Sequence, residues 1–429
     1  MGEIILYAFF LFLLYWVITK RADFIYFIPF FGLGMDMSFN VFVGFGIPAY
    51  VRGVVFFIYF FSAHKYITTN RFFLPFYLFF FWISFLLTQS AELLYSFKAV
   101  IQVVFSMLTF IVAYNYFNTQ QKLFRLLHSL FWVVVVAIVA TSLGYLFGIG
   151  RSFDYLGKND VEEDVIGLLG SSGLYGPGIV IALVPLILKT KPPKYQKILL
   201  PILSIVLYIF MLLTIRRTVI MIPIIGLFGL LFFHRHKAQI IKVFILLIAF
   251  LLVTYPLYEQ VLLQRFEMRK KQGRFEEDFY KTEGRYLENV EIWEQITSFE
   301  EPARILFGLG NKIFAENISD KAIAGRMYHT DFAKLFYGVG IFGIILYVFI
   351  YLTLFLWLYR VPDEARYAEY KAAMFAIFLI LVFVSINGSI NIITYRSIAF
   401  LLLGALMGFV RSERLREVRG KLLYQKENT

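Results

Sequence analysis

The chain has 429 residues, of which 60% are hydrophobic and only 16% are charged. This composition excludes a soluble globular protein, because apolar runs of 18 or more residues require lipid around them. The sequence contains no cysteine, which excludes disulfides, iron–sulfur ligation and thiolate nucleophiles. The net charge of +12 does not indicate nucleic-acid binding, because the Lys and Arg residues cluster in short loops between apolar runs and so encode membrane topology.

Apolar runs follow one another along most of the chain, and their lengths predict an all-α polytopic membrane protein with about 12–13 transmembrane helices. The runs before a large polar stretch are Glu3–Thr19, Asp23–Met35, Val41–Phe61, Phe72–Thr88, Phe97–Phe117, Leu126–Phe147, Gly173–Leu188, Ile198–Thr214, Thr218–Phe233 and Ile240–Pro256. The runs after it are Leu335–Tyr359, Ala372–Ile386 and Ile392–Val410. Asp23–Met35 is too short to cross untilted and is interpreted as a half-span.

Basic residues predict the orientation of these spans. If the spans alternate, the basic loops share one side, which the positive-inside rule makes cytoplasmic. Those loops hold Lys65, Arg71, Lys122, Arg125, Lys189, Lys191, Lys194, Lys197, Arg235, Lys237, Lys242, Arg360, Arg366, Lys371 and the tail Arg411–Lys421. The opposite side receives Gln89–Tyr95, the acidic loop Asp154–Asp164, the Arg216–Arg217 turn and the large polar stretch.

The large polar stretch, Leu257–Lys334, divides the chain. We expect N-terminal membrane helices over 1–256, a large external loop over 257–334, C-terminal membrane helices over 335–410 and a basic cytoplasmic tail over 411–429. Connections longer than roughly 15 residues tend to be functional or disordered. We therefore expect this loop to form one wall of an active site and the membrane helices to form the other.

Arg216 and Arg217 lie on the side that the positive-inside rule disfavours. They interrupt the apolar run Ile198–Phe233, whose roughly 36 helical residues would rise about 54 Å, slightly less than two crossings of a 30 Å core. Two guanidiniums at this edge cost free energy unless an anion meets them, and Arg suits bidentate contacts to phosphate. The alternative is a solvated hairpin tip that snorkels to lipid headgroups.

Arg285 follows Gly284 at the start of a predicted helix that runs to about Phe299. Apolar residues recur near helical spacing along it and could lie on the membrane surface; they are Leu287, Val290, Trp293 and Ile296. Arg285 could bind an anion, or it could be an ordinary partner for Glu288 or Asn289.

His329 immediately precedes the span that starts near Leu335. Thr330 or Asp331 can cap that helix, so the positive end of the helix dipole points to the same place as His329. A neutral imidazole there can act as a general base on a hydroxyl. No second His or Cys has ligand spacing to His329, so no metal site is predicted. The alternative is an ordinary polar loop residue.

The order of these motifs resembles that of the bacterial O-antigen ligase and O-antigen polymerase superfamily, over Thr214 to Gly343. Thr214-Ile215-Arg216-Arg217-Thr218 is similar to its Ser-Arg-Gly/Ser/Thr motif, with Arg217 in the arginine position. Gly284-Arg285 followed by Trp293 resembles the Gly-Arg…Trp opening of its periplasmic loop. Phe307-Gly308-Leu309-Gly310 is similar to its Phe-Gly-x-Gly turn. His329-Thr330-Asp331-Phe332, with Gly338 and then Gly340-Ile341-Phe342-Gly343, resembles its His-Asn-x-x-Leu…Gly-Ile-x-Gly signature, with Thr330 replacing Asn.

The resemblance implies a GT-C-like glycosyltransferase in the bacterial cytoplasmic (inner) membrane, with its active site on the periplasmic or extracellular face and with no cofactor or metal. The donor would be a glycan on undecaprenyl pyrophosphate and the acceptor another glycan or lipid, with membrane lipids and a chain-length regulator protein as further partners. Arg217 and Arg285, together with Arg216, would hold the pyrophosphate and stabilise its developing charge. His329 would position or deprotonate the acceptor hydroxyl, which attacks the anomeric carbon with inversion.

Within this resemblance the leading function is a polymerase that transfers the growing chain onto a lipid-linked repeat unit of a surface polysaccharide, such as O-antigen or capsule. The alternative is a ligase that transfers the chain to lipid A core or another acceptor. A flippase or transporter of the lipid-linked oligosaccharide is a hypothesis of a different class. It predicts charged residues buried mid-span and paired halves, whereas we expect charges at the outer edge and find no internal repeat.

Overall fold

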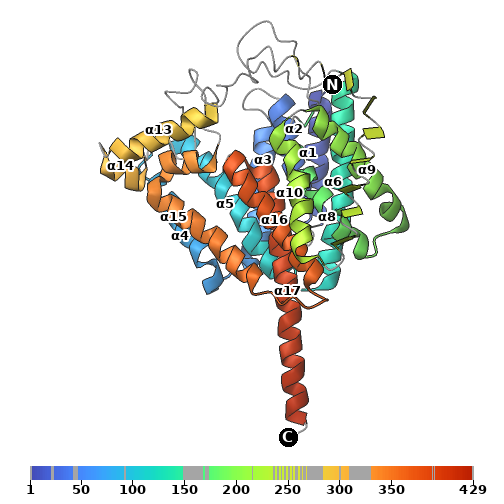
Figure 1. The fold of residues 1–429 in the computed structure, drawn as a ribbon. Coiled ribbons are helices and arrows are strands. Elements are labelled where there is room, and N and C mark those ends of the chain that lie inside the picture. Colours follow the sequence, from blue (N-terminus) through green and yellow to red (C-terminus); the bar gives the residue numbers. More distant parts are fainter. Residues whose placement is uncertain are drawn as a thin grey trace.

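The computed structural model describes residues 2–20, 24–41, 47–90, 93–147, 168–169, 173–214, 216–234, 284–298, 301–308, 330–388, 390 and 392–427, and scattered positions between 237 and 267. Across these ranges the chain forms helices, turns and short connections, and no β-strand occurs among them (Figure 1). The predicted all-α architecture is therefore confirmed for the described part of the chain.

The helices follow the predicted runs closely. Those before the large loop are α1 (Gly2–Thr19), α2 (Ile28–Val41), α3 (Ile47–Ala63), η2 (His64–Tyr66), η3 (Arg71–Phe73), α4 (Leu74–Leu87), α5 (Leu93–Tyr116), α6 (Gln120–Phe147), α8 (Tyr175–Lys189), α9 (Lys194–Leu213) and α10 (Arg217–Phe233). The later ones are α13 (Gly284–Ser298), α14 (Pro302–Phe307), α15 (Asp331–Tyr359), α16 (Ala368–Asn387) and α17 (Ile393–Glu427). The predicted half-span begins at Ile28 rather than Asp23, because residues 24–27 form a turn before α2.

Six helices in the described residues are long and apolar enough to cross a membrane, and shorter apolar helices accompany them. The six are parts of α5, α6, α9, α15, α16 and α17. Large apolar side chains on the surface of the bundle, such as Phe81 at 70% exposure, need lipid rather than water around them. The chain is thus a multi-pass membrane protein. Within the predicted span Ile240–Pro256 the structure describes only scattered positions, and these are helical, with exposed apolar side chains such as Ile248 and Leu252.

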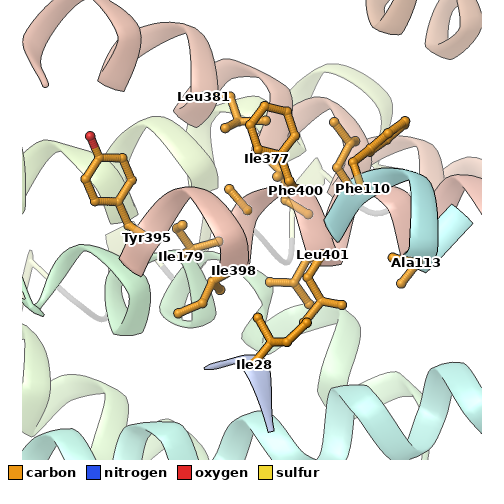
Figure 2. Packing of buried hydrophobic residues seen from close by; sticks show 14 of the residues in the cluster. Ile28, Phe110, Ala113, Ile179, Ile377, Leu381, Tyr395, Ile398, Phe400 and Leu401 are labelled. Carbon is orange, nitrogen blue, oxygen red and sulfur yellow. The ribbon is translucent and has the colours of Figure 1, made fainter. Parts of the chain in front are cut away.

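Helix α17 forms the centre of the bundle, and its membrane-length window is entirely buried. It packs most extensively on α5, where a Cβ on Gly408 would lie 2.2 Å from the Tyr114 carbonyl oxygen. Such close approach requires glycine. Figure 2 shows how Phe400 and Leu401 of α17 pack among side chains of neighbouring helices. The first turn of α17 is thereby held deep within the bundle.

Basic residues of the predicted cytoplasmic loops gather at one end of the bundle. Contacts at one end join basic loop residues to neighbouring helices: Lys189 pairs with Glu369, Arg366 pairs with Glu417, and Arg416 donates to the Asn118 carbonyl. We call this the basic end, and its composition agrees with the predicted alternation of loops. The opposite end holds the first turns of α8, α10, α15 and α17, and we call it the outer end after the predicted orientation.

Candidate active site

The predicted site residues differ in how far the structure describes them. Arg217 is the first residue of α10, and Arg216 is the N-cap residue before it. Arg285 is the second residue of α13, but its side chain lies outside the described residues, and so does the whole of His329. The described chain resumes at Thr330 and Asp331, the two residues that follow His329 in the sequence.

The Arg216–Arg217 turn is a tight connection between α9 and α10. The Thr214 hydroxyl donates to the Met211 carbonyl at 2.7 Å and accepts the Arg216 backbone N–H at 3.3 Å. Arg216 is half-buried and Arg217 is exposed. Because both arginines are at the start of α10, where its dipole is positive, an anion bound there would be stabilised by the dipole and by the two positive charges.

Arg217 lies at about the same height in the bundle as the first turn of α17. A Cβ on Gly178 of α8 would meet Ile222 of α10, and a Cβ on Gly176 would meet Ile398 of α17. Helix α8 runs parallel to α10 and α17. These two contacts therefore fix how far each of the three helices is shifted along the bundle axis relative to the others. They place Arg217 close to the level of Tyr395.

Thr330 caps helix α15, as the sequence predicts. Its hydroxyl accepts the Ala333 backbone N–H at 3.1 Å, and its backbone is extended, as is usual for an N-cap residue. Asp331 follows in the first turn but does not face solvent. Its side chain is fully buried and reaches across the bundle to α17.

A buried ion pair joins Asp331 to Arg396 of α17. The Arg396 Nη2 atom lies 2.6 Å from each Asp331 carboxylate oxygen, and the two side chains are 0% and 1% exposed. Tyr347 completes a triangle, because its hydroxyl donates to Asp331 Oδ2 at 2.6 Å and accepts from Arg396 Nη1 at 3.2 Å. The two opposite charges compensate each other, and Tyr347 adds a hydrogen bond to each of them. This matters because an isolated charge is costly in this environment.

The hydrogen bonds continue from this pair to α16. The Tyr351 hydroxyl lies 2.8 Å from Ser385 Oγ and 3.1 Å from the Tyr347 hydroxyl, and Ser385 donates to the Leu381 carbonyl. The ion pair and these hydroxyls therefore tie α15, α16 and α17 together near the outer end. Sequence reasoning missed Arg396 because it lies within an apolar run. An arginine inside a membrane-length segment is itself a signal of a functional or structural site.

Helix α15 is broken at Gly340, whose φ of 66° and ψ of −173° are not helical. In a straight helix Asp331 and Tyr347, 16 residues apart, would be separated by about 24 Å. Their hydrogen bond therefore requires the first segment of α15, Asp331–Val339, to fold back against the remainder. Directly before the break, Trp82 Nε1 of α4 donates to the Val339 carbonyl at 3.1 Å.

Two glycine motifs from the sequence meet at this break. Gly308 ends α14 with a φ of 83°, and a Cβ on it would lie 2.6 Å from the Val339 nitrogen. A Cβ on Gly340 would lie 2.4 Å from the Leu306 carbonyl oxygen. The contact is therefore backbone against backbone, which only glycine permits. Gly308 of the first motif and Gly340 of the second thus belong to one structural unit.

Helix α13 docks on the first segment of α15. The Tyr337 hydroxyl donates to the buried Glu291 carboxylate at 3.1 Å, and Ile292 and Ile296 pack against a small cluster that includes Ile305. The predicted apolar stripe is therefore divided between two faces, because Ile296 packs inward whereas Trp293 is 68% exposed. This docking brings α13, which carries Arg285, onto the helix segment that follows His329.

The fold and the buried polar cluster define an all-α multi-pass membrane protein whose folded-back helix segment is anchored by an ion pair. No protein-family model matches the chain, and a search of curated proteins found no similar sequence. The described residues contain no group of three or more His, Cys, Asp or Glu side chains that could hold a metal ion.

Proposed function

We propose that the chain is a GT-C-like membrane glycosyltransferase of the O-antigen polymerase type. It would transfer a glycan from undecaprenyl pyrophosphate onto a lipid-linked repeat unit at the outer face of the bacterial cytoplasmic membrane. The observation that supports this most strongly is the docking of α13, α14 and the first segment of α15. That docking gathers the Arg285 helix, Gly308, Gly340 and the Thr330–Asp331 cap beside the outer end of the bundle.

In this proposal the site residues divide the reaction between them. Arg217 and Arg285, with Arg216, bind the pyrophosphate and stabilise the negative charge that it acquires as the anomeric C–O bond breaks. His329 accepts the proton of the acceptor hydroxyl, whose oxygen forms the new bond to the anomeric carbon. Asp331 is a positioning residue, because its pairing with Arg396 anchors the chain two residues after His329.

The lipid-linked glycans of a deletion strain test the proposal, with complementation by variants. We expect His329→Ala and Arg285→Ala to abolish long-chain polysaccharide while the protein remains inserted and expressed. Matched controls are His64→Ala, at the basic end, and Arg304→Ala, a half-buried residue of α14 that pairs with Glu301. Wild-type levels of polysaccharide from both site variants would refute the assignment.

The ligase alternative is separated by what accumulates in the deletion strain. Single capped repeats indicate a polymerase, whereas long chains left on undecaprenyl indicate a ligase. Both functions use the same pyrophosphate chemistry, so the variants of His329 and Arg285 affect both alike.

A transporter of the lipid-linked glycan is favoured by one observation, namely the charged residues buried within the bundle. Asp331, Arg396 and Asp36 are all buried. The sequence analysis had instead placed the charged residues at the outer edge, and buried charges are what a transporter predicts. The purified protein in detergent discriminates between the two classes. A glycosyltransferase extends a lipid-linked acceptor without two compartments, whereas a transporter forms no new glycosidic bond.

A further inference from the structure

A groove between α1, α2 and α6 lies away from the candidate active site. Its cavity volume is about 410 Å³, which is within the usual size range of small-molecule sites. Apolar and aromatic side chains form most of its walls: Phe9, Leu13 and Trp16 of α1, Phe30 of α2, and Trp132 and Val136 of α6. Two cations, Lys20 and Arg125, line the same cavity.

The length of the groove matches one leaflet of a bilayer. From Phe9 to Lys20 the chain rises about 16 Å, which is close to half of a hydrocarbon core about 30 Å thick. Phe9 would therefore lie near the bilayer centre and Lys20 at the headgroup level. An acyl chain that entered from the interface would lie against these apolar walls, with Trp16 and Phe30 in edge-to-face contact at 5.6 Å on one of them.

The charged end of the groove coincides with the basic end of the bundle. Arg125 lies 4.9 Å from the Tyr26 ring, and Tyr26 in turn donates to the Lys122 carbonyl near the start of α6. Lys20 reaches this place from the end of α1, so the two cations come from different helices. The leaflet that the basic loops assign to the cytoplasm is the leaflet in which anionic lipids attract Lys and Arg.

We propose that this groove binds one phospholipid with an anionic headgroup. The headgroup contacts Lys20 and Arg125, and one acyl chain lies along Phe9, Leu13 and Phe30. Apolar walls alone would accept any lipid, because lipid tails are as apolar as the side chains. The two converging cations supply selectivity for negative charge. This inference does not depend on the proposed glycan transfer.

Tryptophan fluorescence tests the proposal, because Trp16 and Trp132 line the groove and are two of five tryptophans in the chain. The full-length protein in detergent is titrated with phosphatidylglycerol or phosphatidylcholine that carries brominated acyl chains. Bromine quenches nearby indoles, and the difference between the wild type and a Trp16→Phe/Trp132→Phe variant isolates the signal of the groove. We expect phosphatidylglycerol to reach half-maximal groove quenching at an about tenfold lower concentration, since each cation near the surface contributes to anionic-lipid attraction.

Charge variants decide whether the two cations cause this preference. Lys20→Gln/Arg125→Gln should bring the half-maximal concentrations of phosphatidylglycerol and phosphatidylcholine close together. Lys20→Arg/Arg125→Lys keeps both charges and should keep the preference for phosphatidylglycerol. A Lys65→Gln/Arg71→Gln variant removes equal charge at the basic end without touching the groove and should keep the preference. Equal quenching by the two lipids in the wild type, or a preference that survives in Lys20→Gln/Arg125→Gln, would overturn the proposal.

Discussion

Replacing Arg396 by glutamine removes the guanidinium that compensates the buried Asp331 carboxylate. Three short contacts are lost with it, namely two to the carboxylate oxygens at 2.6 Å and one to the Tyr347 hydroxyl at 3.2 Å. Breaking a buried pair by removing one partner costs about 3–5 kcal/mol, because the remaining charge is left without compensation. Since the Tyr347 hydroxyl still donates to Asp331, we expect a loss of about 3 kcal/mol, at the lower limit of that range.

A double-mutant cycle tests this value. The stabilities of Arg396→Gln, Asp331→Asn and the double variant are measured by reversible unfolding in mixed micelles with increasing dodecyl sulfate, followed by circular dichroism. The double variant should be destabilised by less than the sum of the single variants, by roughly 2 kcal/mol or more, because two neutral amides leave no buried charge.

Arg416→Gln is the matched control on the same helix. Arg416 is exposed and pairs with Glu413 at 2.6 Å, so its loss should change stability little. The reasoning is refuted if Arg396→Gln is no more destabilising than Arg416→Gln, or if the two single effects simply add in the double variant.

Three further predictions concern the outer end of the molecule. Arg217→Ala should reduce glycan transfer more than Arg216→Ala, and the reverse ranking would assign the anion to Arg216. Gly340→Ala should sharply lower the yield of monodisperse protein in size-exclusion chromatography, because alanine disfavours a φ of 66° and its Cβ would collide with backbone. Tyr337→Phe removes a hydroxyl donor to Glu291 and should weaken the docking of α13 by about 1–3 kcal/mol, seen as faster amide hydrogen exchange in α13.

Matched substitutions separate these effects from general damage. Gly178→Ala should leave the yield nearly unchanged, because its Cβ would meet only side-chain atoms at 3.2 Å or more. Tyr367→Phe removes a similar phenol–carboxylate bond, to Glu417, at the basic end and should not alter exchange in α13. Unchanged exchange in Tyr337→Phe would mean that the apolar cluster alone holds α13.

Much of the fold could be predicted from the sequence, because a bilayer imposes a minimum length on each apolar run and charge orients the loops. The cap at Thr330 was also predictable, since an N-cap is a local motif. The pairing of Asp331 with Arg396 was not, because hydropathy averages a single arginine into its apolar surroundings. The contact between Gly308 and Gly340 depends on how two distant segments pack, which spacing alone does not reveal.

The ion pair also has a consequence for how the chain is made. Asp331 leaves the ribosome 65 residues before Arg396, a delay of about 3–13 seconds at usual rates of synthesis. During that interval the carboxylate has no guanidinium to compensate it and is costly to place in lipid. We therefore expect the first segment of α15 to complete its insertion only after α17 has emerged and Arg396 can pair with Asp331. Helix α17 would thus complete the placement of a segment that was synthesised 65 residues earlier.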